Sequence, residues 1–324
     1  MTDTNIWKRA SKAAYTDVYN RKEEPKPLPK PRSISQVAGE RLAEKVMEAY
    51  APKTGYPDLD GIIKGFIPGH LYTVTGVENV GKTSLACNFS VRVAKQKKKV
   101  LYFALEPENT VVDYLASVRF NKEFNDLTTD DLEYDDGFIH VYGKQEISKV
   151  DDLARIIEEL PKYDLVIIDH IGYFITSQQN WLQEQSNTIK RLAGLAKAKK
   201  CAIVMIAHLR KRSTAQKRDY TPSSDDIAGS GSFKQDSTEV MIVTRDLIDP
   251  KSPDPEYSNQ GWLYVTKTKC GPNGKIRITF QNFKANITTD GEQAQLMGEN
   301  SIRYTQDTIY IGDEAKDQEM EDNF

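Results

Sequence analysis

Residues 76–83 read GVENVGKT, and this stretch decides the fold. It matches the pattern GxxxxGK[ST], follows the apolar run LYTVT at 71–75 and leads into SLACNFSVRVA, which has a helical pattern. Glycine at positions 76 and 81 lets the backbone curl so that successive N–H groups point inward and can cradle phosphates. The pattern predicts that the Lys82 amine reaches the β- and γ-phosphates and that the Thr83 hydroxyl binds Mg²⁺.

The expected ligands are therefore ATP, or another NTP, and Mg²⁺. The loop residues that we expect to contact the nucleotide are Gly76, Val77, Glu78, Asn79, Val80, Gly81, Lys82, Thr83 and Ser84.

Two acidic residues follow other apolar runs. LVIID at 165–169 ends in Asp169, which we expect to hold the Mg²⁺ shell, through water because this ion keeps several waters. KVLYFALEPE at 99–108 places Glu106 just after a strand that we expect beside the strand of the phosphate loop. A carboxylate there could activate the attacking water, and Glu108 is the nearby alternative. The chain is thus predicted to be an ATP hydrolase.

Strand and helix patterns alternate from residue 54 to residue 285. Apolar runs at 71–76, 99–105, 165–171 and 201–208 are separated by helical patterns at 82–97, 110–121, 150–160 and 181–199. This alternation predicts an α/β fold with a mostly parallel central sheet flanked by helices. The later runs at 240–245, 262–268 and 275–280 lie close together, and GPNG at 271–274 predicts a C-terminal β-hairpin.

The two ends of the chain differ from this core. Residues 1–32 are basic and rich in proline, which predicts a flexible or extended segment. Residues 33–53 contain an amphipathic helical pattern that Ser35 could cap. This helix could dock on a neighbouring subunit or fold onto its own domain. Residues 286–324 are polar and end in DEAKDQEMEDNF at 313–324, an acidic tail that is either solubilising or a docking segment for a basic partner.

Bulk composition narrows the function classes. The chain has 324 residues, a formal net charge of −3 and three scattered cysteines, which suits a reducing compartment and gives no metal or disulfide framework. No apolar run is long enough to span a membrane, and the N-terminus lacks the apolar stretch of a secretory signal. We expect a cytoplasmic protein of a bacterial or phage-infected cell.

The motifs in this order resemble the RecA-like motor of hexameric replicative helicases, of the DnaB type and of the bifunctional phage helicase–primases. The resemblance covers residues 54–285. Besides the phosphate loop, it rests on ALE at 104–106, IIDHI at 167–171, AHLRK at 207–211, DDIAGSGSFKQDSTEV at 225–240 and KTKCGPNG at 267–274.

The resemblance implies roles for four further residues. His208 would sense the γ-phosphate, and Gln235 would help couple the nucleotide state to the DNA-binding loop. Lys267 and Lys269 would reach into the ATP site of a neighbouring subunit. The DnaB type has Lys-x-Arg at these positions, and a lysine cannot give the planar, bidentate grip of guanidinium. Arg245 and Arg277 are other candidates for this cation.

A basic loop follows the expected sensor. Residues 209–224 read LRKRSTAQKRDYTPSS, and such a loop in a ring of subunits would contact the phosphates of single-stranded DNA. The residues that we expect to bind DNA are Arg210, Lys211, Arg212, Lys217, Arg218 and Gly231.

Two functions stay open at this stage. The first is a DNA helicase of replication that hydrolyses ATP at the subunit interfaces of a ring, with six subunits expected. The second is a recombinase-like or helicase-loader ATPase that binds DNA under the control of a nucleotide and does not unwind it. A lysine at position 269 favours the second function, and the order of the motifs favours the first.

Overall fold

The computed structural model describes residues 30–105, 108–133, 137–177, 179–208, 230–248, 256–281, 286–289 and 295–296. Its contacts divide the chain into two units, residues 1–45 and 46–324, which we describe separately. Several predicted site residues lie outside the described residues, namely Glu106, Arg210, Lys211, Arg212, Lys217 and Arg218. The acidic tail at 313–324 also lies outside them.

Helix α2, Ile34–Ala49, confirms the helix expected near the N-terminus. Its cap is Ser33 and not Ser35. The Ser33 hydroxyl accepts the N–H of Gln36 at 3.2 Å, and the Gln36 side chain accepts the N–H of Ser33 at 3.0 Å. This reciprocal pair satisfies two N–H groups that the first turn of a helix would otherwise leave without partners.

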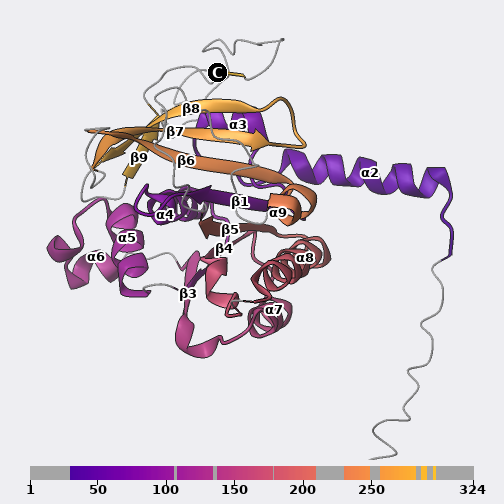
Figure 1. Cartoon of the computed structure of the whole chain (residues 1–324), viewed down its shortest axis with the longest axis horizontal. Coiled ribbons are helices and arrows are strands. Elements are labelled where there is room, and N and C mark those ends of the chain that lie inside the picture. Colours follow the sequence, from indigo (N-terminus) through magenta and orange to yellow (C-terminus); the bar gives the residue numbers. More distant parts are fainter. Residues whose placement is uncertain are drawn as a thin grey trace, which may run out of the picture. The chain divides into compact units, whose positions relative to one another are not determined.

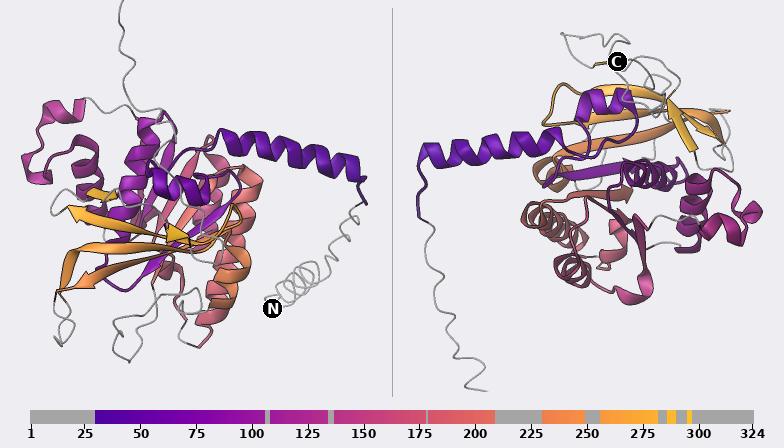
Figure 2. Two further views of the ribbon diagram at one scale, coloured as in Figure 1. Left: turned by 90° about the horizontal axis from the view of Figure 1, so that it is seen from above. Right: turned by 180° about the vertical axis from the view of Figure 1, so that it is seen from behind.

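Among the described residues of the second unit, ten strands form one sheet (Figure 1). Their order is β10-β8-β7-β6-β1-β5-β4-β2-β3, with β9 paired to β8. The strands β1 to β6 run parallel to one another, β7 pairs antiparallel with β6, and β8 pairs antiparallel with β7 (Figure 2). The bounds are β1 Leu71–Gly76, β2 Val100–Ala104, β3 Ile139–Gly143, β4 Leu165–Asp169, β5 Ala202–His208, β6 Glu239–Leu247, β7 Tyr257–Lys267, β8 Gly274–Gln281, β9 Asn286–Thr289 and β10 Gln295–Leu296.

Helices cover both faces of the parallel strands (Figure 1), so the central residues of β1, β2, β4 and β5 are all buried. One core packs against α3, α4 and α5, and the other packs against α7, α8 and α9. The bounds are α3 Pro57–Ile63, α4 Lys82–Lys95, α5 Glu108–Phe120, α6 Thr129–Glu133, α7 Val150–Glu159, α8 Trp181–Lys199 and α9 Ser230–Asp236. No helix among the described residues is both long and apolar enough to cross a membrane.

The predicted α/β fold with a C-terminal hairpin is confirmed, and one predicted adjacency is wrong. We expected β2 beside the strand of the phosphate loop, but β1 pairs with β5 and β6, whereas β2 pairs with β4 and β3. Two strands, β5 and β4, therefore separate β2 from β1. Any carboxylate that follows β2 therefore starts three strands away from the strand of the phosphate loop.

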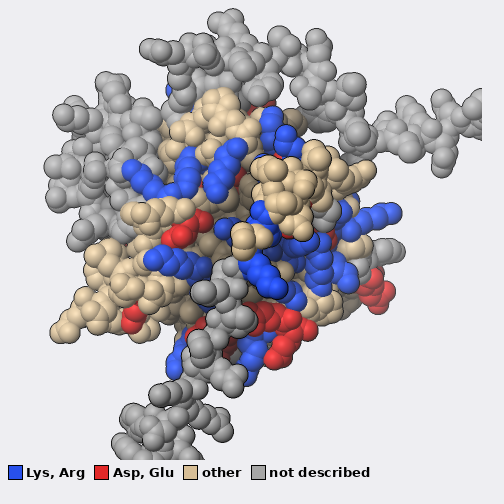
Figure 3. All heavy atoms as spheres, turned by 90° about the vertical axis from the view of Figure 1, so that its right-hand side faces the viewer, with Lys and Arg blue, Asp and Glu red and all other residues tan. Residues whose placement is uncertain are grey.

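The strand directions give the sheet two functional edges. The phosphate-loop edge contains the carboxyl ends of β1, β4 and β5, at Gly76, Asp169 and His208. The hairpin edge contains the starts of β1 and β6 and the turn at 268–273 between β7 and β8, since Lys267 pairs with Val240 of β6. Lys and Arg side chains gather on the side of the molecule toward which this turn points (Figure 3).

Candidate nucleotide site

The phosphate loop has a backbone that only glycine fits at two positions. Gly81 has φ +95°, and a Cβ there would lie 2.3 Å from Cε1 of Phe280 in β8. Gly76 ends β1, where a Cβ would lie 2.6 Å from the carbonyl oxygen of Val243 in β6. The neighbouring strands therefore shape the loop from outside, and α4 begins directly after it at Lys82. The N-terminus of a helix attracts anions through its unpaired N–H groups and its dipole.

Lys82 lies inside the loop and is buried. Its Nζ donates to the carbonyl oxygen of Val77 at 2.7 Å, so the ammonium group is held by the loop itself. Burial lowers the pKa of Lys82 to about 8, and the carboxylates of Asp169 and Glu78 partly offset this effect. An arriving phosphate would replace the carbonyl with a full negative charge, so the amine is positioned for the predicted contact.

Asp169 ends β4 close to the phosphate loop. Its carboxylate is buried and hydrogen-bonded to the Thr83 side chain, and burial is the main cause of its raised pKa. Oxygen ligands of this kind, a carboxylate and a hydroxyl, are those that Mg²⁺ prefers. The structure thus brings together the two residues that we predicted as metal ligands, and their chemistry fits that ion.

Tyr102 is a residue of this site that the sequence analysis missed. It lies in the middle of β2, is fully buried, and its hydroxyl donates to Oδ2 of Asp169 at 2.9 Å. This bond fixes one oxygen of the carboxylate that also contacts Thr83. A lone hydroxyl within the apolar run VLYFA was the available signal, because a buried tyrosine needs a polar partner.

His208 ends β5 and pairs in register with Gly76, the first residue of the phosphate loop. Its side chain is exposed, and its ring lies edge-to-face on the ring of His170, with 4.4 Å between the centroids. His170 is oriented in turn, since its Nδ1 accepts the N–H of Gly172 at 2.9 Å. The predicted sensor therefore adjoins both the phosphate loop and the residue that follows Asp169.

The four candidates for the cation that reaches a neighbouring ATP site lie at two different edges of the sheet. Arg245 and Arg277 lie toward the phosphate-loop edge, where Arg245 stacks on Phe280 and Arg277 pairs with Asp246 at 2.6 Å. Lys267 lies at the hairpin edge, and its amine donates to the carbonyl oxygens of Lys234 and Ser237 at the end of α9. Lys269 is exposed in the turn of the same edge. Of the two predicted lysines, Lys269 is thus the better placed to reach another molecule.

Gln235 is not brought to the phosphate loop of its own chain. It is exposed in the last turn of α9, three residues before Thr238, whose N–H donates to the carbonyl of Leu71 at the start of β1. This position lies toward the hairpin edge. Gly231 is exposed in the first turn of α9, directly after the undescribed residues 209–229.

Glu108, the alternative to Glu106, begins α5 and is partly buried. Its carboxylate lies over Gly143 at the end of β3, where an added Cβ would come within 2.0 Å of Oε2. This site is beyond β2 on the side away from β1. Glu108 is therefore farther along the sheet from the phosphate loop than the sequence analysis assumed.

Comparison with known proteins shows which family has a similar sequence. Residues 52–289 match the family described as the DnaB-like helicase C terminal domain. The replicative DNA helicase DnaB of Buchnera aphidicola subsp. Baizongia pistaciae is 28% identical over 248 residues, which are 70% of this chain and 53% of that protein. The same helicase of Geobacillus stearothermophilus is 26% identical over 266 residues, 75% of this chain and 58% of that protein. The chain thus spans a little over half the length of these relatives.

Solved structures show the same fold. One of them, an ATPase domain, superposes with a TM-score of 0.65 at 17% identity, and the match covers 80% of this chain and 99% of that chain. A DnaB-like replicative helicase, described with its interactions with primase, gives 0.62 at 15% identity and covers 87% and 71%. The RadB recombinase gives 0.53 at 16% identity and covers 73% and 98%.

Proposed function

Because the chain belongs to the family of DnaB-like helicase C-terminal domains, we propose that it hydrolyses ATP with Mg²⁺ and uses the energy to move along single-stranded DNA during replication. The observation that carries this proposal is the separation of the site into two halves. The phosphate loop and Asp169 lie on one edge of the sheet, and the exposed Lys269 lies on the other.

Such a division requires a second copy of the chain. Lys269 cannot reach the phosphate loop of its own subunit across the length of β1, but it can reach the loop of a neighbour that packs head to tail. Repeated head-to-tail contacts form a closed ring when the rotation between subunits closes. We therefore propose a ring, with six subunits as the expected number, in which ATP binds between neighbours.

The residues of the phosphate-loop edge would act in sequence. Lys82 leaves the Val77 carbonyl and binds the β- and γ-phosphates, while Thr83 and Asp169 hold Mg²⁺. The Mg²⁺ would neutralise charge on the phosphates as the bond to the γ-phosphate breaks. His208, which pairs in register with Gly76, would sense the loss of that phosphate and pass the change to the basic loop that follows it.

DNA binding is proposed from the sequence of this basic loop. Its five cations, Arg210, Lys211, Arg212, Lys217 and Arg218, would track the phosphates of a single strand, and affinity should then fall with salt. Docking of the acidic tail at 313–324 on a replication partner, and a cytoplasmic location, stay predictions of the sequence.

A second function retains one observation in its favour. Lysine at 269, where the resemblance implies arginine, suits a slow nucleotide switch of the recombinase or helicase-loader type, because ammonium binds phosphate as a point charge only. The similarity to a recombinase is one of fold. The relatives matched over most of this chain are replicative helicases, which favours the first function.

The test is steady-state ATP hydrolysis with and without single-stranded DNA, combined with unwinding of a forked duplex. A motor should be stimulated tenfold or more by DNA, about 1.4 kcal/mol of coupling, and should open forks. Slow turnover with tight DNA binding and closed forks would select the switch instead. Lys82→Ala supplies the inactive control.

A mixing experiment tests the shared site directly. Lys82→Ala subunits lack the loop amine and Lys269→Ala subunits lack the proposed trans cation, so each variant alone should be inactive. In a random mixture about one quarter of the head-to-tail interfaces would combine an intact loop with an intact Lys269. Recovery of activity on mixing supports the shared site, and an inactive mixture contradicts it.

A further inference from the structure

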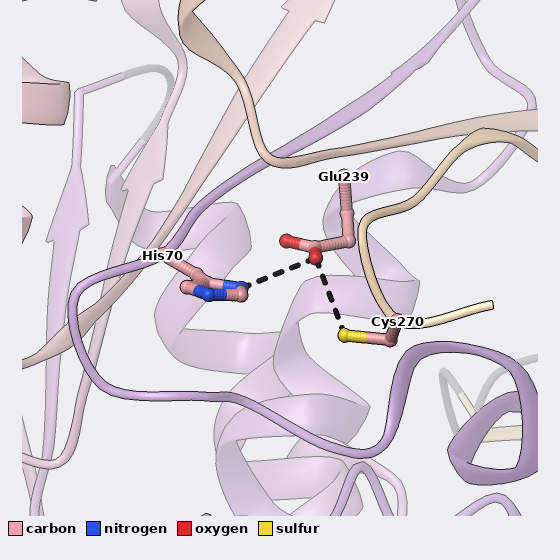
Figure 4. Close-up of side chains that lie close together, drawn as sticks. All are labelled: His70, Glu239 and Cys270. Atoms are coloured by element: carbon pink, nitrogen blue, oxygen red, sulfur yellow. Dashed lines mark hydrogen bonds and ion pairs between the residues drawn. The ribbon is translucent and has the colours of Figure 1, made fainter. Parts of the chain in front are cut away.

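Three side chains with metal-ligating atoms meet at the hairpin edge, away from the nucleotide site. His70 precedes β1, Glu239 is the first residue of β6, and Cys270 lies in the turn between β7 and β8 (Figure 4). His70 Nδ1 lies 3.1 Å from Oε1 of Glu239, and the Cys270 Sγ lies 3.8 Å from the same oxygen. The three ligand atoms lie within 4.8 Å of one another. One metal ion contacts ligands at about 2.0–2.3 Å, so this spacing suits a shared ion.

The buried carboxylate at the centre points to a missing ligand. Glu239 is 0% exposed, and its Oε2 has no hydrogen-bond partner among the described residues. A carboxylate buried with one oxygen unsatisfied is costly, and buried charges are normally paired or coordinate a metal. The contacts from His70 and Cys270 reach only Oε1, so they leave this second oxygen unexplained.

We propose that His70, Glu239 and Cys270 bind one divalent cation of the Zn²⁺ type. Sulfur, nitrogen and oxygen ligands together suit Zn²⁺, whereas Mg²⁺ prefers oxygen alone. On binding, the Cys270 thiol gives up its proton to water and a metal–sulfur bond forms, while neutral His70 binds through Nδ1 and keeps its proton on Nε2. A water molecule completes the tetrahedron.

The ion would join three segments that are far apart in the sequence. Cys270 directly follows Lys269, so a metal at this point fixes the turn that presents Lys269 to a neighbour. His70 and Glu239 anchor the turn to the starts of the two central strands β1 and β6. The ion would thus hold the turn in place, and its binding does not depend on nucleotide, DNA or ring formation.

Cobalt provides the direct test. The reduced, metal-free full chain is titrated with Co²⁺ alone, without nucleotide, and the near-ultraviolet absorption of thiolate-to-cobalt charge transfer is recorded. We expect one equivalent to bind and Zn²⁺ to displace it. Cys270→Ser should abolish the band, and Cys201→Ser, which changes a buried cysteine beside α8 instead, should retain it. Absence of the band in the unaltered chain, or its persistence in Cys270→Ser, overturns the proposal.

Thermal unfolding gives a second measurement, which does not depend on the absorption of a cobalt complex. Zn²⁺ at a hundredfold excess over its Kd should raise the Tm of the metal-free chain by roughly 5 °C. The rise should persist in Cys201→Ser and disappear in Cys270→Ser and His70→Asn. An equal rise in all four proteins would place the metal elsewhere and refute this site. Because neither assay includes ATP, a failed helicase proposal leaves both results interpretable.

Discussion

The two edges of the sheet are organised differently. At the phosphate-loop edge, functional side chains are held by bonds within one chain, as Lys82 is by Val77 and Asp169 is by Tyr102. At the hairpin edge, Lys269 is exposed. The first edge is thus ordered by contacts within one chain, whereas the second would complete its role only in the proposed ring, by contact with a neighbouring subunit. Substitutions at the first edge should therefore change binding, and those at the second should change turnover.

The largest effect is expected from Gly81→Ala. The backbone at this position has φ +95°, and the added Cβ would meet Phe280 at 2.3 Å. We expect a loss of stability of about 3 kcal/mol and nucleotide binding weakened at least about a hundredfold. Isothermal titration with ATP and urea unfolding would measure the two effects.

Gly194→Ala is the matched control, since a Cβ at Gly194 in α8 meets nothing within 4 Å. It should leave ATP binding unchanged and raise stability slightly, by about 0.5 kcal/mol. Unaltered ATP affinity in Gly81→Ala would show that the loop does not need its observed shape.

Lys269→Ala tests the hairpin edge. Turnover should fall about a hundredfold, because one trans charge on the transferring phosphoryl group is lost. The Kd for ATP of the isolated subunit should change less than twofold. Lys269→Arg should keep or raise turnover, since guanidinium binds phosphate with two parallel bonds.

Lys95→Ala, which removes another exposed lysine at the end of α4, is the control for surface charge and should leave kcat unchanged. Equal kcat values for Lys269→Ala and the unaltered protein would exclude Lys269 as the trans cation.

Tyr102→Phe should have an intermediate effect. It removes the donor to the buried Asp169 carboxylate, which costs about 1–3 kcal/mol of unfolding free energy. We expect the Mg²⁺ concentration for half-maximal ATP hydrolysis to change about tenfold, because such second contacts orient metal ligands.

Tyr72→Phe is the control that separates the loss of stability from the change in Mg²⁺ requirement. The Tyr72 hydroxyl is also buried and bonded, but to the backbone at Gly65 and Ile67. Its loss should lower stability without changing the Mg²⁺ requirement. If both variants alter that requirement equally, Tyr102 has no specific role at the metal.

The last prediction, which needs no substitution, is a pH dependence of ATP binding that is absent near neutral pH. The pKa of Lys82 is lowered to about 8 by burial, so the free protein loses this positive charge as the pH rises above that value. Affinity should be level near pH 7.5 and then fall, approaching about tenfold for each further pH unit. Glu78 raises this pKa, so Glu78→Gln should start the fall at a lower pH. A level profile up to pH 9.5, measured by titration, would contradict a Lys82 pKa lowered to about 8.

The parts of the fold that were predictable from sequence carry their signal locally. The runs 71–76 and 165–169 are buried at every position because helices cover both faces of those strands. β3 was missed because IHVYG is partly exposed at the sheet edge and contains a polar histidine. The position of β2 in the sheet could not be predicted from the sequence, since strand order depends on the crossover connections and not on the composition of the strand.

The site residues also differ in whether the sequence alone could predict them. Gly81, Lys82, Thr83 and Asp169 belong to continuous motifs whose chemistry needs those residue types, so they were predictable. Tyr102 acts on Asp169 across 67 positions of sequence, and no spacing rule connects the two. His70, Glu239 and Cys270 meet only because β1, β6 and the hairpin turn are brought together by the sheet.

The contact of Lys267 with α9 has an evolutionary consequence. Its ammonium group is held by the backbone carbonyls of residues 234 and 237, and every amino acid supplies such a carbonyl. This contact therefore places no demand on which side chains occupy 234 and 237, whereas position 267 needs a long basic residue. Related sequences should vary at 234 while they retain a lysine, or at most an arginine, at 267.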